Sequence, residues 1–60
     1  MVTVALDLPE AQAEALAQFM KRVGWQEWRQ NAVDDDEAAL MRLACDGLRK
    51  ALAEAGYAPR

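Results

Sequence analysis

Residues 34–57 read DDDEAALMRLACDGLRKALAEAGY, and this stretch decides the fold that the sequence predicts. Its apolar and small residues recur at the spacing of one face of a helix. These residues are Leu40, Leu43, Ala44, Gly47, Leu48, Ala51, Leu52 and Ala55. The stretch therefore predicts one long helix over residues 34–55.

Both ends of this helix are marked in the sequence. Asp34 can cap the start by accepting from unpaired backbone N–H groups, and Glu37, three residues later, can complete a capping box. At the other end, Gly56 can adopt the left-handed conformation that ends helices, and Tyr57 can supply the apolar contact that accompanies it. Pro59 then prevents the helix from continuing.

The residues before this helix predict a strand and two further helices. Residues 2–8, VTVALDL, alternate in hydrophobicity, which is typical of a half-buried strand. Pro9 ends the strand and suits the first turn of a helix over residues 9–23, with Gly24 as a candidate C-cap. Residues 25–31 predict a short Trp-containing helical turn. The expected fold class is therefore mainly α, with a short N-terminal β-strand, two main helices and this short turn.

The chain is expected to form a single small domain over residues 1–60, and a domain of this length buries little surface when alone. Cys45 is the one cysteine and there is no histidine, so neither an intrachain disulfide nor a Cys/His zinc site can form. The predicted strand also needs a partner strand, and the chain has no second candidate. We therefore expect a homodimer that pairs two such strands in an antiparallel β-ribbon.

The expected dimer contacts lie in the strand and in the long helix. In the strand they are the side chains of one face, Val2, Val4, Leu6 and Leu8. In the long helix, Gly47 is flanked by alanines, and small residues at this spacing let another helix approach closely. The alternative for Gly47 is a tolerated weak point, because glycine lowers helix propensity by roughly 1 kcal/mol relative to alanine.

Residues 2–24 resemble the start of ribbon-helix-helix proteins. VTVALDL matches the N-terminal strand of that family, Pro9–Val23 matches its Pro-initiated first helix, and Gly24 matches the turn before its second helix. The resemblance implies that two chains form a ribbon that lies in the major groove of DNA. It places the base-reading positions at Thr3, Ala5 and Asp7.

The candidate DNA-binding residues are few. Thr3 can contact a base edge, whereas Asp7 would repel phosphates. The basic residues around the Gly24 turn can hold a phosphate backbone or an acidic partner, or they can simply compensate helix dipoles in solvent. These residues are Lys21, Arg22 and Arg29. The net charge of −3 disfavours indiscriminate binding to nucleic acid or to an anionic membrane.

Two other groups of residues are candidates for binding a protein partner. Trp25 and Trp28 can form an exposed anchor, since tryptophan is enriched in interface hot spots. The alternative is that at least one of them closes the small core. The acidic run can be a docking patch or a surface that mimics nucleic acid, or it can be a helix cap with a solvated first turn. It consists of Asp34, Asp35, Asp36 and Glu37.

The sequence argues against an enzyme. It has no histidine, no Gly-rich phosphate loop and no nucleophile with an evident base, and it is short for enclosing a pocket. Cys45 is expected to be a small core residue. We therefore expect no catalytic residue, no metal ligand and no cofactor. No signal peptide or membrane-length apolar segment is visible, so we expect no membrane association and a cytoplasmic location.

Three functions remain, and each is the non-catalytic binding of a macromolecule. The first, which we favour, is a small dimeric protein-interaction module on a ribbon-helix-helix-like scaffold. The second is a ribbon-helix-helix transcriptional regulator that binds DNA. The third is a small acidic inhibitor or nucleic-acid mimic of the kind that mobile elements encode.

Overall fold

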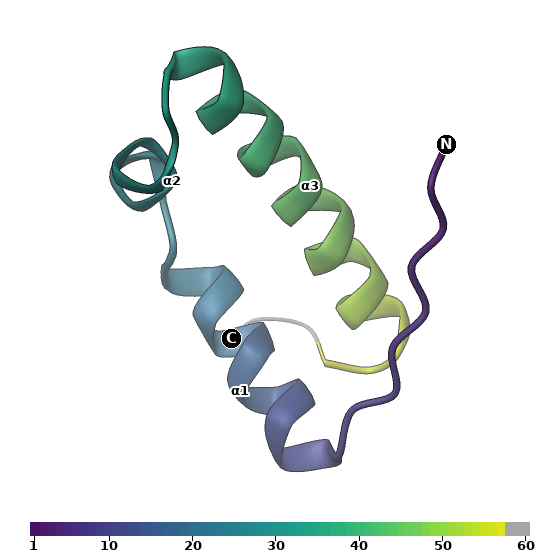
Figure 1. Ribbon diagram of the computed structural model, residues 1–60. Coiled ribbons are helices and arrows are strands. Elements are labelled where there is room, and N and C mark those ends of the chain that lie inside the picture. Colours follow the sequence, from purple (N-terminus) through teal and green to yellow (C-terminus); the bar gives the residue numbers. More distant parts are fainter. Residues whose placement is uncertain (58–60) are drawn as a thin grey trace.

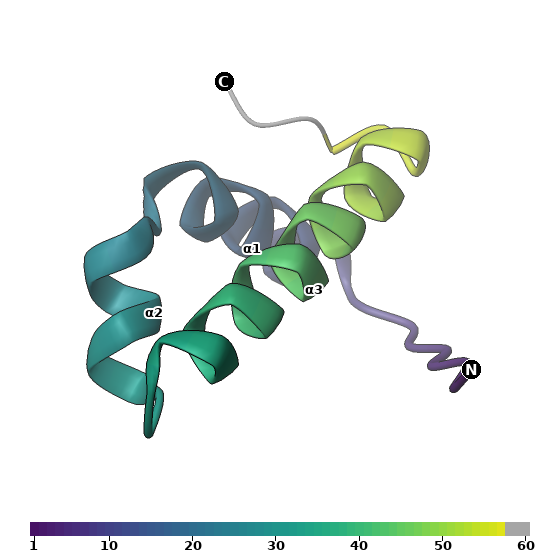
Figure 2. The same cartoon turned by 90° about the horizontal axis from the view of Figure 1, so that it is seen from above.

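The computed structural model describes residues 1–57, and within them the chain forms three helices. α1 spans Glu10–Arg22, α2 spans Trp25–Asn31 and α3 spans Asp35–Glu54. α3 is the longest, and both other helices pack against it (Figure 1). Figure 2 shows α2 beside the first half of α3, with α1 crossing further along. Nowhere in residues 1–57 is a helix long and apolar enough to cross a membrane.

The helices lie within the predicted ranges, which were residues 9–23, 25–31 and 34–55. The expected stop at Pro59 lies outside the described residues. Local signals mark most of the helix boundaries: Pro9 precedes α1, Gly24 precedes α2, and α3 has a signal at each end.

Residues 2–8 do not form the predicted β-strand, since the described chain contains helices and no strand or sheet. Val2, Val4 and Leu6 are 89%, 83% and 73% exposed, so the alternating side chains are not half-buried. The segment instead runs beside the second half of α3 (Figures 1 and 2). Alternation favours a strand only where a second strand takes up the backbone hydrogen bonds, and the described chain supplies none.

This difference overturns three expectations. The resemblance to ribbon-helix-helix proteins is wrong, because the defining strand is absent from the described residues. The fold class with an N-terminal strand is wrong for the same reason, and so is a dimer held by an antiparallel β-ribbon. The described fold is all-helical.

The start of α3 is capped by two side chains. Asp34 lies just before the helix, and its Oδ1 accepts from the backbone N–H of Glu37 at 2.8 Å. The Glu37 carboxylate reaches back, but it accepts from the N–H of Val33 at 3.0 Å, one residue earlier than a standard capping box requires. These bonds satisfy donors that would otherwise lack partners, and they fix the angle at which the chain enters α3.

The end of α3 is a Schellman motif. Gly56 has a φ of +97°, in the left-handed region that favours glycine. The N–H of Tyr57 donates to the carbonyl of Leu52 at 2.8 Å, and the N–H of Gly56 donates to that of Ala53 at 3.0 Å. Tyr57 packs against the buried cluster that contains Leu52. The helix therefore ends through the two signals that the sequence carries.

The buried core is small and consists mostly of alanine. Its fully buried members are Ala13, Ala17, Met20, Ala38 and Leu52. Small side chains let α1 and α2 approach α3 closely, but they bury little apolar area. Neither tryptophan belongs to this set: Trp28 is half-buried and Trp25 is 46% exposed.

Gly24 does not act as the predicted C-cap of the first helix. Its φ of −141° is extended, and it directly precedes α2, where its N–H donates to Oε1 of Glu27 at 2.8 Å. Had α1 continued, this N–H would have bonded to the carbonyl of Met20. Because α1 ends before Gly24, the carbonyl of Met20 remains available to another donor.

Arg49 of α3 supplies that donor. One of its terminal guanidinium nitrogens donates to the Met20 carbonyl at 2.6 Å, while the other forms an ion pair with Asp46 at 3.4 Å. The bond joins residues 29 positions apart and places a positive charge at the C-terminal end of α1, where the helix dipole favours it. It therefore ties α1 to α3.

Replacing Arg49 by methionine should lower the stability of the fold. The substitution keeps an apolar stem but removes a charge-assisted hydrogen bond, so the expected loss is about 1.5–3 kcal/mol. Denaturant unfolding followed by circular dichroism measures it. Arg42→Met is the matched control, because Arg42 is an exposed arginine on the same helix. Equal losses for the two variants would contradict the assigned role of Arg49.

Replacing Asp34 by alanine should also lower stability, since the first turn of α3 loses its side-chain cap. The expected loss is about 1 kcal/mol, and Asp34→Asn should recover most of it because asparagine also caps helices. Asp36→Ala is the control, since it removes the same charge from the same turn. If Asp36→Ala cost as much as Asp34→Ala, charge rather than capping would explain the effect.

Candidate functional site

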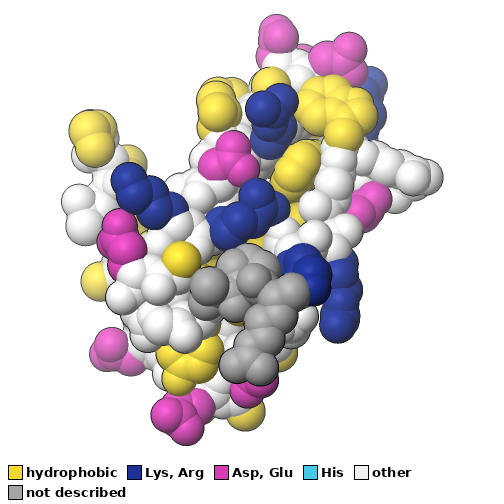
Figure 3. All heavy atoms as spheres, turned by 180° about the vertical axis from the view of Figure 1, so that it is seen from behind, with side chains coloured by type: hydrophobic (Ala, Val, Ile, Leu, Met, Phe, Trp, Pro, Cys, Tyr) yellow, Lys and Arg dark blue, Asp and Glu magenta, His cyan; other side chains and the backbone are white. Residues whose placement is uncertain are grey.

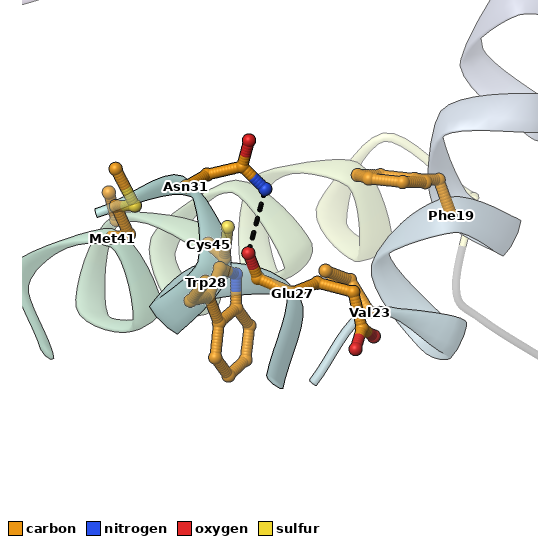
Figure 4. A pocket seen from close by; sticks show the side chains of 8 residues that line it. Phe19, Val23, Glu27, Trp28, Asn31, Met41 and Cys45 are labelled. Carbon is orange, nitrogen blue, oxygen red and sulfur yellow. Dashed lines mark hydrogen bonds between the residues drawn. The ribbon is translucent and has the colours of Figure 1, made fainter. Parts of the chain in front are cut away.

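An apolar groove lies where α1, α2 and α3 meet, and it is the feature best suited to bind another molecule. Its volume is about 320 Å³. α1 contributes Phe19 and Val23, and Phe19 is 56% exposed. The other lining residues come from α2 and α3: Glu27, Trp28, Asn31, Met41, Ala44 and Cys45. We call it the Phe19–Trp28 groove, and Figure 4 shows its side chains around a common opening.

Two polar side chains of the groove, Asn31 and Glu27, form hydrogen bonds within α2 and its N-cap. The side-chain amide of Asn31 donates to the backbone carbonyl of Glu27 at 2.8 Å, drawn as the dashed line in Figure 4. The Glu27 carboxylate accepts from Gly24. Six of the eight lining side chains are apolar or weakly polar, so the groove is suited to bury apolar side chains of another molecule.

The two tryptophans have different surroundings although they are three residues apart. Trp28 lines the groove and is half-buried, and its Nε1 is buried without a hydrogen-bond partner among residues 1–57. Its indole is therefore held by packing. Trp25 is 46% exposed and is not among the lining residues. Of the two predicted anchors, only Trp28 contributes to the groove.

The acidic run forms the N-cap and the first turn of α3. Asp34 and Glu37 cap α3, as described above. The carboxylate of Asp35 forms an ion pair with Nε of Arg29 at 2.6 Å, and Asp36 is exposed. Seen from behind, acidic side chains lie at the end of the molecule where α3 begins (Figure 3). The run therefore serves as a cap and also leaves negative charge in solvent at the start of α3.

The candidate DNA-binding residues do not form one surface. Thr3 is exposed in the N-terminal segment, whereas Lys21 and Arg22 are exposed in the last turn of α1. Figures 1 and 2 place these two regions on opposite sides of α3. Arg29 pairs with Asp35 and also donates to the carbonyl of Ala32 at 3.2 Å. A basic surface that spans all four residues is therefore not formed.

The candidate dimer residues lie around a second hollow, of about 390 Å³, between the N-terminal segment and α3. Val4, Leu6 and Leu8 line it from the N-terminal segment, together with Leu16 of α1. From α3 the lining residues are Leu48, Ala51, Leu52 and Ala55. Val2 is exposed and does not line this hollow, and Gly47 is exposed on α3.

Sequence reasoning missed the contribution of Phe19, Met41 and Cys45 to the groove. Phe19 has the helical spacing of the apolar residues in the first helix, which predicts only that it faces the core side, and Cys45 was expected to be a small core residue. Periodicity identifies an apolar stripe but not which part of it a neighbouring helix covers. The apolar residues of α1 cover a wider face than α3 can contact. This excess is the signal that could have identified Phe19 as a residue left exposed beside the contact.

The described residues offer no evident site for a metal ion. Among residues 1–57, no group of three or more cysteine, aspartate or glutamate side chains is arranged to hold one. The groove itself carries one carboxylate, one amide and one thiol, from Glu27, Asn31 and Cys45. Its chemistry is that of apolar contact.

Comparisons with known proteins assign the chain to a family. Neither the search of curated proteins nor the search of solved structures found a match. The sequence does match a family model, described as a family of unknown function (DUF7706), over residues 1–60. The match covers the whole chain, and the protein therefore belongs to this family.

Proposed function

We propose that this protein is a non-catalytic protein-interaction module whose Phe19–Trp28 groove binds a basic amphipathic helix of a partner protein. The observation that carries this proposal is the groove itself, with Phe19 exposed at its edge and Trp28 and Met41 in its lining. Apolar grooves between helices commonly take the apolar face of a partner helix, with residues at helical spacing as anchors.

The electrostatics of the groove support a basic partner. Glu27 lines the groove, and Asp34 and Asp36 carry exposed carboxylates at the start of α3. Arg29 and Asp35 neutralise each other in an ion pair. The chain as a whole carries a net charge of −3. Lysine or arginine residues beside the apolar anchors of the partner would be attracted to this end of the molecule, which favours fast and specific association.

The side chains available in the groove support binding rather than catalysis. The Glu27 carboxylate is held by the Gly24 N–H, and the Asn31 amide is held by the Glu27 carbonyl. Cys45 is half-buried among apolar neighbours. These contacts fix the shape of the groove, and a fixed shape lowers the entropy cost of binding.

A direct test uses a fluorescein-labelled model helix with leucine on one face and lysine on the other. The native protein should bind it, and Phe19→Ala should weaken binding by about tenfold or more, because aromatic anchors dominate interface energies. Fluorescence anisotropy gives the dissociation constants. Trp25→Ala is the matched control, since it also removes an exposed aromatic side chain but one outside the groove.

The charge part of the proposal is tested with a second model helix in which glutamate replaces lysine. Binding of the lysine helix should weaken as salt is raised, and the glutamate helix should bind much less tightly. Equal binding of the two helices, or equal effects of Phe19→Ala and Trp25→Ala, would contradict the proposed function.

A further inference from the structure

The N-terminal segment, residues 2–8, turns one of its two faces to the hollow beside α3. Val4, Leu6 and Leu8 line this hollow, whereas the residues between them do not. Successive side chains of an extended chain point to opposite sides, so every second residue shares a face. The alternation in this segment therefore fits an extended chain that lies along helices (Figure 1), and it does not require a second strand.

The hollow is lined only by aliphatic side chains. The helices contribute Leu16, Leu48, Ala51, Leu52 and Ala55. The residues of the segment that do not line it include Thr3 and Asp7, and both are exposed. An apolar face of the segment thus lies over an apolar surface of the helices, while the polar side chains remain in water. Burying these two apolar surfaces against each other is favourable.

The segment contacts the helices closely at only one end. Leu8 is half-buried, but the exposed fraction rises along the segment to 73% at Leu6 and 83% at Val4. Within residues 1–57, no backbone hydrogen bond joins residues 1–8 to α1 or α3. The hollow of about 390 Å³ is the space that this incomplete contact leaves. The segment is therefore anchored at Leu8 and lifts away from α3 toward its N-terminus.

We propose that residues 2–8 are a strap that closes over this hollow, turning about Leu8 and burying Val4 and Leu6 against α3. Closure removes aliphatic surface of the segment and of the helices from water, which favours the closed arrangement. The entropy lost when the segment is ordered opposes it. The position of the strap sets how much apolar surface this end of the molecule presents to other molecules.

The length of the strap fits the part of α3 that lines the hollow. Val4 and Leu8 are four positions apart, and four residues of extended chain span about 13 Å. Leu48 and Ala55 are seven positions apart, and seven residues of helix span about 10 Å. The apolar face of one strap is therefore long enough to cover this stretch of α3.

The strap does not rest on the proposed function. The hollow and the Phe19–Trp28 groove have no lining residue in common. Failure of the strap would leave the peptide-binding test of the groove unaffected, and failure of that test would leave the strap unaffected.

The first test compares thiol reactivity on the two faces of the segment, in the full chain with Cys45→Ala. Leu6→Cys places a thiol on the face toward the hollow, and Ala5→Cys is the matched control on the other face. Iodoacetamide should modify the thiol at position 6 at least about tenfold more slowly than the thiol at position 5, because closure protects it. Repeating both reactions in denaturant corrects for intrinsic reactivity, and there the difference should vanish.

Equal reactivity at positions 5 and 6 under native conditions would overturn the proposal. It would mean that the segment is an open tail without a preferred face. Both substitutions are at exposed positions outside the helices, and circular dichroism checks that the helices are intact.

The second test uses disulfide formation within one chain, again with Cys45→Ala. Leu6→Cys combined with Ala51→Cys should form an intrachain disulfide under mild oxidation at least about tenfold faster than Ala5→Cys combined with Ala51→Cys, because closure brings only the first pair within bonding distance. Equal rates for the two pairs, or no intrachain disulfide in the first pair, would overturn the proposal. Mass spectrometry at low protein concentration separates the intrachain product from cross-linked chains.

Discussion

The packing of both shorter helices on α3 is the constraint on which the rest of the structure depends. α1 and α2 each contact α3, so α3 sets the position of each. Arg49 donates to the Met20 carbonyl near the end of α1 across 29 positions, and Arg29 of α2 forms an exposed ion pair with Asp35 at the start of α3. Because Gly24 turns the chain between α1 and α2, the two helices diverge and leave the Phe19–Trp28 groove between them.

The small core explains why so much apolar surface remains in solvent. Alanines at Ala13, Ala17 and Ala38 bring the helices close, but each buries little area. Most of the larger side chains therefore fall outside the contact, on α1 at Phe19 and on α3 at Leu40 and Leu43. Exposed apolar patches on a small chain are typical of interaction surfaces. The proposed partner helix in the groove accounts for one such patch.

Several charged side chains of the chain stabilise the helix ends near them. Asp34 and Glu37 cap α3, Glu27 binds the N–H of Gly24, and Arg49 caps α1. A residue engaged in this way has a stabilising role that does not depend on a partner. The acidic side chains of Glu27, Asp34 and Asp36, all exposed, are the reason for proposing a basic protein partner rather than nucleic acid.

The sequence by itself determined where the helices lie, the start of each helix and the end of α3. Asp34, Gly24 and Gly56 act through bonds to residues within a few positions, and such local bonds form wherever the chain is placed. The strand expected at residues 2–8 was wrong, because a strand needs hydrogen bonds from another segment, which alternation alone cannot reveal. Only the tertiary structure decided that Phe19 and Trp28 share a groove, since the angle between helices depends on how Ala17, Met20 and Leu52 pack together.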